Sequence, residues 1–446
     1  MGQHNEAYGI RPAQGEWIGI PQPPPEVYVP RQHRHGGTEG FSLRSAAAAL
    51  TSLLALAATG LVAGPVAAAT RDATPCALPR TDAHHSLGLD TWNDAYPRPE
   101  RNLEAVMVFL SFPDSEPLLP PDVLAADHFP ATARFFEHAS YGAFTLRAHP
   151  QRQWVRMPRP STWYGIQRDW ASERRSAYFR DAVEAVDDRV DFSAYDIVYL
   201  VADPDAPGVD SDATKVVNFD RPLTADGTDI RRVVTVFEEH PPDRNVLAHE
   251  TGHVFDLADL YHRPEDGKGD WDTYVGDWDV MGSQFGLAPD LFGWHKWKLG
   301  WLGGDEIVCV QGGADLTLVP MAEVPPPGAS KGTRLAVIRT GPDSALAVEA
   351  RSAVGNDRTT CTEGILIYRI HNGTPSGGGP VEVLDTHPHS EACRDRSVYP
   401  PLADAPLGEG ERYTVPGGHV RIEVAGRTAS GAWTVRITTG ADEGDA

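Results

Sequence analysis

The chain has 446 residues, of which 41% are hydrophobic and 23% are charged, and its formal net charge is -23. This length is ample for a buried core and exceeds that of one ordinary domain. The strong negative charge repels phosphate backbones and so argues against nucleic-acid binding. None of the four cysteines belongs to a C-x-x-C pair, which argues against a thiolate zinc knuckle.

The N-terminal sequence predicts a leader followed by an export segment. Residues 1–43 are polar and Pro-rich and show no apolar periodicity, which is typical of disorder. Arg44 then precedes a charge-free apolar run, 45–69, that ends in three alanines, as signal peptidase sites do. We therefore expect a signal peptide over 44–69 and a secreted, extracellular protein. Because the run is long enough to span a bilayer, an uncleaved single-pass membrane anchor with the catalytic part outside is the alternative.

The four cysteines predict two disulfides after export. Cys76, Cys309, Cys361 and Cys393 allow three pairings, of which Cys361 with Cys393 is the most local. An alternative role for Cys76, which comes early in the mature chain, is to cap a catalytic metal as a latency switch.

Residues 70–303 alternate predicted strands with predicted helices. An irregular N-terminal arm, 70–100, precedes compact apolar runs typical of buried strands and segments with helical spacing. The predicted strands are 104–112, 143–150, 195–203 and 231–239, and the predicted helices are 130–142, 172–186 and 289–301. This alternation favours an α+β catalytic domain over 101–303.

Beyond residue 303 the pattern changes to short runs rich in Val, Ile and Thr. Examples are RLAVIRT, ALAVEA, GILIYRI and AWTVRITT, which Gly, Pro or Asp separate. No convincing helix interrupts these runs. They predict an antiparallel β-sandwich domain over 304–446.

The stretch LAHETGHVFDLADLYH, 247–262, carries the strongest functional signal. His249 and His253 stand four residues apart, so a helix places both imidazoles on one face. Glu250 is rotated off that axis, where it can reach a water on the metal without becoming a ligand. This H-E-x-x-H order is the pattern of zinc peptidases. The apolar flanks predict a mostly buried helix, with Asp243 as its N-cap.

A catalytic zinc needs a third protein ligand and one open position. Asp259, ten residues after His249, is the favoured third ligand, and His262 and Glu265 are its rivals. Metzincin-type sites have a glycine at the intervening turn, where this chain has Asp256. Aspartate tolerates the left-handed backbone conformation better than most residues, so the turn can persist.

A second metzincin feature follows the zinc helix. Met281 lies in GDWDVMGS, 276–283, between acidic residues and glycine. It is the candidate for the Met-turn, a methionine in a tight turn beneath the metal. Its expected role is to form an apolar floor, not to bind zinc.

The segments HETGHVFDLADLY, WDVMGSQFG and WHKWKLGWL together resemble the immune inhibitor A-type secreted bacterial zinc metallopeptidases. The zinc helix of that family reads H-E-x-G-H-x-x-G-L-x-D-x-Y, and this sequence departs from it only at Asp256. The likeness runs from about residue 101 to 386, where VFLSFPD, ASYG and GILIYRIHNG are weaker matches. The resemblance implies a zincin-like catalytic fold and a secreted endopeptidase of broad specificity, often carrying calcium.

We therefore expect peptide-bond hydrolysis by a zinc-activated water, with Glu250 as general base. Tyr261 or Tyr274 is the candidate donor to the oxyanion. Residues 231–237 could form an edge strand that pairs with an extended peptide, or a central strand. The expected partners are protein or peptide substrates, and the chain is expected to be a monomer.

Two acidic loops, 203–212 and 265–272, are candidates for Ca²⁺. Neither has EF-hand spacing, and solvated turns are the simpler explanation. The alternative function is a non-catalytic cell-surface binding protein on a decayed peptidase scaffold. The intact Glu250 argues against that alternative, because a structural zinc needs no base beside it.

Overall fold

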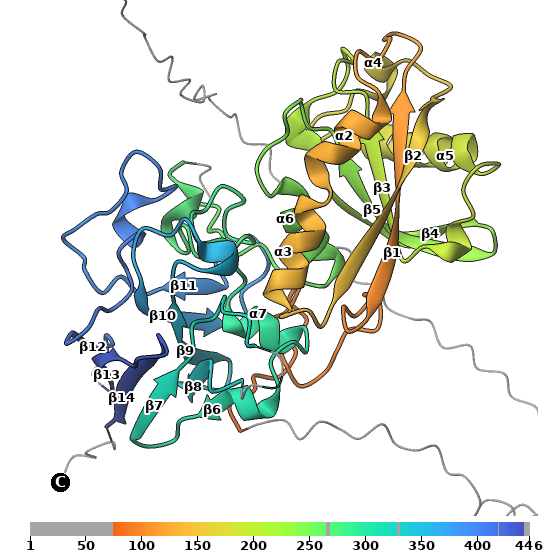
Figure 1. The fold of residues 1–446 in the computed structure, drawn as a ribbon. Helices are drawn as coiled ribbons and strands as arrows, with labels where there is room; N and C mark the ends of the chain where they lie inside the picture. The colour runs from red at the N-terminus through yellow and green to blue at the C-terminus, as the bar shows by residue number, and fades with distance from the viewer. Residues whose placement is uncertain (1–74, 265–267, 327, 329–330, 418, 441–446) are drawn as a thin grey trace, which may run out of the picture. The chain divides into compact units, whose positions relative to one another are not determined.

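The computed structural model describes residues 75–440, apart from 265–267, 327, 329–330 and 418 (Figure 1). The predicted leader at 1–43 and the predicted signal peptide or anchor at 44–69 lie outside the described residues. Among the helices of the described part, none combines the length and the apolar character that a membrane span requires.

Five strands form the first sheet, in the order β2-β1-β3-β5-β4. They are β1 Asn102–Ser111, β2 Thr145–Arg156, β3 Ile197–Ala202, β4 Lys215–Ala225 and β5 Thr228–Val236. β1 is parallel to β2 and β3, β3 is parallel to β5, and β4 runs antiparallel to β5. Helices α2 Pro121–His128 and α3 Ala131–Ala139 connect β1 to β2, and α4 Ser161–Tyr164 and α5 Ser172–Val186 connect β2 to β3, whereas the chain from β3 to β5 passes through β4.

Strand β1 contributes to two separate cores, because successive side chains of a strand point to opposite faces. Met107 and Phe109 join one core, and Val106 and Val108 join the other. In Figure 1, α3 and α6 (Val246–Val254) lie on one side of this sheet and α5 lies on the other. The helix with the H-E-x-x-H residues is therefore packed directly against the sheet.

Strand β4 forms the edge of this sheet next to α6. It was not among the strands predicted from the sequence. Strand β5 lies between β3 and β4, so residues 231–237 are central and offer no free edge to a substrate. Asp226 and Gly227 join β4 to β5 with φ values of 52° and 71°, as a type I′ turn requires. This Asp-Gly pair was the available sequence signal for the β4–β5 hairpin.

The C-terminal part contains two further sheets. One has the order β11-β10-β9-β8-β6 and the other has the order β12-β13-β14-β7. Their strands are β6 Ile307–Cys309, β7 Ala314–Leu318, β8 Leu335–Arg339, β9 Ser344–Arg351, β10 Gly364–His371, β11 Val381–Val383, β12 Arg412–Thr414, β13 Val420–Arg427 and β14 Trp433–Thr439. The two sheets share one apolar core. One pair, β6 with β8, is parallel, whereas the sequence predicted antiparallel pairing throughout.

The described part is thus a mixed α+β fold with three sheets and few helices, as the sequence predicted. The predicted helix 172–186 is α5, with the same bounds, and 130–142 contains α3. The predicted helix 289–301 is shorter, since α7 spans Gly293–Lys298. The prediction of Asp243 as the N-cap of α6 is wrong. Asn245 occupies the N-cap position with a φ of 59°, and its side chain makes no capping hydrogen bond.

The first sheet and the β11-β10-β9-β8-β6 sheet are joined by one continuous apolar core. It includes Leu87 of the arm, Met107 of β1, Leu247 of α6, Ala347 of β9 and Leu366 of β10. A disulfide between Cys76 and Cys309 links the arm to β6, and a second joins Cys361 to Cys393. Two disulfides were expected from the sequence, which could not choose among the three pairings, and the structure shows the pairing that includes the most local bridge. Because Cys76 is oxidised, it cannot serve as a thiolate cap on a metal.

Candidate metal centre

Helix α6 holds the candidate ligands on a buried, rigid support. Every residue of the helix is buried. The hydroxyl groups of Tyr199 in β3 and Thr251 in α6 are 2.8 Å apart and hydrogen-bonded, which fixes the helix to the sheet. Leu247 and Val254 pack into the apolar core. Such packing restricts the rotamers of the polar side chains that project from the other face.

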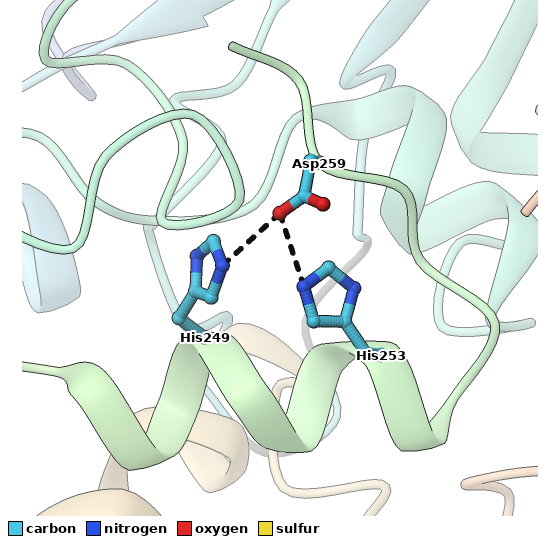
Figure 2. Close-up of side chains that lie close together, drawn as sticks. All are labelled: His249, His253 and Asp259. Atoms are coloured by element: carbon cyan, nitrogen blue, oxygen red, sulfur yellow. Dashed lines mark ion pairs between the residues drawn. The ribbon is translucent and has the colours of Figure 1, made fainter. Parts of the chain in front are cut away.

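Three side chains converge above α6 (Figure 2). Oδ1 of Asp259 lies 3.2 Å from Nε2 of His249 and 3.1 Å from Nε2 of His253. The ligand atoms of this group all lie within 4.8 Å of one another. Around a tetrahedral ion with bonds of about 2.0–2.1 Å, neighbouring ligand atoms are about 3.3 Å apart. The spacing therefore fits one metal ion shared by the three side chains.

The protein also fixes which nitrogen of each ring faces the cluster. Nδ1 of His249 lies 2.8 Å from the carbonyl oxygen of Val280, and Nδ1 of His253 lies 2.8 Å from that of Leu257. A carbonyl only accepts hydrogen bonds, so each Nδ1 carries the proton. In the neutral rings Nε2 then presents a lone pair toward Asp259, as a metal-ligating histidine does.

The electrostatics of the cluster favour a bound positive charge. Burial alone lowers the pKa of His253, but the Asp259 carboxylate outweighs burial and raises that pKa to about 9. Burial alone raises the pKa of Asp259, but the two histidines hold it well below its usual range. Protons and a metal cation would therefore compete for the same ligand atoms.

Glu250 extends from the same helix but lies outside the three-residue cluster. Its Oε2 accepts a hydrogen bond of 2.8 Å from the Val216 N–H of β4. Burial raises the pKa of Glu250, and the neighbouring His249 and His253 offset that effect only in part. A buried carboxylate with a raised pKa is suited to accept a proton near neutral pH.

The cluster opens into a cavity of about 870 Å³. The three candidate ligands and Glu250 all line it. Other parts of its wall are His84 of the arm, Val216 and Asn218 of β4, Tyr261, Trp271 and Ser376. The cluster therefore shares one cavity with the edge strand β4.

The two tyrosines considered as oxyanion donors lie in different places. Tyr261 lines the cavity, and burial together with a hydrogen bond to Asp259 raises its pKa. Tyr274 instead stacks on His262, with ring centroids 4.5 Å apart. Neither Tyr274 nor His262 is among the described residues that line the cavity. Glu265, the other rival ligand, lies outside the described residues.

The turn between the two ligand segments is left-handed at Asp256, with φ 62°. The side chain is fully buried and pairs with three cationic or ionisable groups. Its carboxylate lies 2.9 Å from Arg80, 2.9 Å from His85 and 3.3 Å from Lys298. Asp256 thus keeps the left-handed turn and anchors the N-terminal arm beside the cluster.

Met281, the Met-turn candidate, packs against α6 at Gly252. Its Sδ lies 2.3 Å from where a Cβ on Gly252 would stand, so a larger residue at that helix position would displace the Met281 side chain. The Met281 N–H donates to Asp279 Oδ1 at 2.8 Å, and its carbonyl accepts from the Leu260 N–H at 2.9 Å. The turn therefore supports both the helix and the segment that carries Asp259.

Sequence reasoning missed the support that distant segments give to the cluster. The ring of His85 stacks on that of His253, with centroids 5.5 Å apart. The Ser376 hydroxyl donates a 3.0 Å hydrogen bond to Asp259 Oδ2, across 117 positions of sequence. No local motif signals either contact, because both depend on how the whole chain folds.

The acidic loops proposed for calcium cap turns wherever they are described. Asp203 Oδ1 accepts from the Asp205 N–H, and Asp210 Oδ1 accepts from the Asp212 N–H, both at 3.1 Å. In the second loop, residues 265–267 lie outside the described part. Calcium binding by either loop stays a prediction.

Comparisons with known proteins give little further information. No protein-family model matches this chain, and no curated protein matches it. Two crystal structures of wild type OgpA from Akkermansia muciniphila show 10% and 11% sequence identity to it, with TM-scores of 0.25 and 0.27. These matches cover 66% and 78% of this chain, and 95% and 98% of the OgpA chains. TM-scores this low do not establish a shared fold or a shared function.

Proposed function

We propose that this protein is a secreted, zinc-dependent endopeptidase related to the immune inhibitor A-type metallopeptidases, with a zincin-like catalytic part. One observation carries the proposal. Oδ1 of Asp259 meets Nε2 of both His249 and His253 within 3.2 Å, and Glu250 lines the same cavity without joining the cluster. Three ligands, an open side and a separate carboxylate are what a zinc hydrolase requires.

The choice of zinc follows from the donor set. Two imidazole nitrogens and one carboxylate oxygen are typical of catalytic zinc, whereas calcium prefers six or more oxygen ligands. Zinc, when bound, supplies a Lewis acid that lowers the pKa of a coordinated water toward about 7 and polarises a carbonyl. His249, His253 and Asp259 would hold it.

The protein's own groups then account for the movement of protons. Glu250 accepts a proton from the attacking water and passes it to the nitrogen of the leaving amine. Its hydrogen bond from the Val216 N–H holds one carboxylate oxygen in place. The Tyr261 hydroxyl lies in the same cavity and would release its hydrogen bond to Asp259 in order to donate one to the oxyanion that develops on the scissile carbonyl.

Strand β4 offers a place for an extended substrate. Because the Val216 N–H points away from β5 and toward Glu250, the backbone groups of every second residue along this edge also face the cavity. Asn218 is the next such residue, and it lines the cavity. A peptide added along this edge would place its scissile bond next to Glu250.

The test compares casein digestion and zinc content in wild type and Glu250→Gln. We expect one zinc per chain in both proteins, with digestion by the variant reduced about 10²–10⁴-fold, since it lacks the base. Glu239→Gln is the matched control: Glu239 is exposed and lies outside the cavity wall, so its digestion rate should equal that of wild type. Equal digestion by Glu250→Gln and wild type would reject the assigned base. Stoichiometric zinc without digestion by wild type would favour the non-catalytic binding protein.

A further inference from the structure

The loop between β10 and β11, residues 372–379, pairs with the segment that carries the third candidate ligand. The Gly377 N–H donates to the Asp259 carbonyl, the Gly379 N–H donates to the Tyr261 carbonyl, and the Arg263 N–H donates to the Gly377 carbonyl, all at 3.0 Å. These bonds form a short ladder, so the loop between β10 and β11 contributes directly to the wall of the proposed metal site.

Within this β10–β11 loop, Ser376 contacts Asp259 at two points. Its Oγ accepts a 2.9 Å hydrogen bond from the Asp259 N–H and donates a 3.0 Å bond to Asp259 Oδ2. The other carboxylate oxygen, Oδ1, is the one that faces His249 and His253. We infer that Ser376 is a positioning residue that presents Asp259 to the metal through a single oxygen.

The N-terminal arm holds the base of the same loop. Asn372 is fully buried, and its Oδ1 accepts a 3.1 Å hydrogen bond from the Ser86 hydroxyl. The Thr81 hydroxyl donates to the Asn372 carbonyl at 3.0 Å, and the Ser376 N–H donates to the His84 carbonyl at 3.3 Å. The backbone of Ser376 is therefore bonded to the N-terminal arm while its hydroxyl contacts Asp259.

The physical effect is pre-organisation of the ligand. A carboxylate on a flexible segment can rotate, exchange its two oxygens or turn toward solvent, and each alternative must be given up when a metal binds. A hydrogen bond that fixes Oδ2 removes those alternatives before binding. Loss of such an outer-shell partner typically weakens metal affinity about 10–100-fold.

The test measures the zinc dissociation constant of the full chain by competition with a chromophoric chelator. This inference rests on the proposed zinc centre, but the readout needs no substrate. Ser376→Ala should bind zinc about 10–100-fold more weakly than wild type, while Ser376→Thr, which keeps a hydroxyl, should stay within about threefold of wild type. Thr374→Ala is the control. Thr374 lies in the same loop, and in the described part of the chain its hydroxyl makes no hydrogen bond to the cluster. It should match wild type.

Each other outcome also decides the matter. Equal zinc affinity of Ser376→Ala and wild type overturns the inference, and so does a wild-type protein that binds no zinc. If Ser376→Ala does not fold, the isosteric pair Ser376→Thr and Ser376→Val gives the same comparison, and equal affinity of that pair overturns it. Zinc binding that depends on the Ser376 hydroxyl, in a protein that digests no casein, supports this inference and contradicts the proposed endopeptidase.

Discussion

Asp256 combines a strained backbone with a buried charge. Its φ of 62° lies in the left-handed region, and its side chain is fully buried. Burial alone raises the pKa of this carboxyl, but the hydrogen bond from His85 and the charges of Lys298 and Arg80 outweigh burial and lower it. The carboxylate therefore stays ionised and stabilises the turn through its ion pairs.

This balance predicts the effect of placing glycine at position 256. Asp256→Gly relieves a left-handed strain of about 1 kcal/mol, but it leaves buried Lys298 and its neighbours without their counter-charge, which costs about 3–5 kcal/mol. We expect a net loss of about 2–4 kcal/mol in unfolding free energy, measured by urea denaturation at pH 7.

A matched control comes from the β4–β5 turn. Asp226 has a similar φ of 52° and is exposed, and its carboxylate accepts one hydrogen bond from the Phe192 N–H. Asp226→Gly relieves the strain and loses that single bond, worth about 1 kcal/mol, so the unfolding free energy should change by less than about 1 kcal/mol. A variant Asp256→Gly that is as stable as wild type, or more so, would contradict the view that the ion pairs matter more than the strain.

Strand β4 connects the first sheet to the Glu250 carboxylate, the proposed general base. The Val216 N–H faces outward from the sheet and bonds Glu250, so proline at this edge position removes a donor without breaking the ladder to β5. That hydrogen bond lowers the pKa of Glu250, against the larger, opposite effect of burial.

Val216→Pro should therefore raise the pKa of Glu250 further. Because a general base must be ionised, activity is present above this pKa and is lost as pH falls through it. We expect the acidic limb of the kcat/KM profile to move to higher pH, by somewhat less than one unit for a hydrogen bond worth about 1 kcal/mol. Val216→Ala keeps the N–H and should leave the limb in place. A limb that does not move, or moves to lower pH, in the proline variant would show that this bond has no influence on the base.

How well each element could be predicted depends on how local its determinants are. Helix α5 was predicted with its bounds because apolar residues recur at helical spacing over 172–186. Strand β4 was missed because its apolar pattern is short, although Asp226-Gly227 marked the hairpin. The cap of α6 was assigned to Asp243 from residue type alone, whereas the chain enters that helix through a left-handed Asn245.

At the scale of the whole molecule, the candidate site depends on contacts between distant segments. His249, Glu250, His253 and Asp259 were predictable because they lie within eleven positions of one motif. Arg80 meets Asp256 across 176 positions, and Ser376 meets Asp259 across 117. Neither contact has a local signal, since each forms only after the arm, the first sheet and the β11-β10-β9-β8-β6 sheet share one core. The sequence thus indicates the chemistry of the site more fully than it indicates what holds the site together.

The central claim is that one zinc ion binds between His249, His253 and Asp259. The most direct measurement is anomalous X-ray diffraction from crystals of the zinc-loaded protein, recorded on both sides of the zinc absorption edge. We predict a single strong peak per chain, about 2.0–2.2 Å from Nε2 of each histidine and from an oxygen of Asp259. A fully occupied zinc at another place, with no peak between these three side chains, would contradict the account.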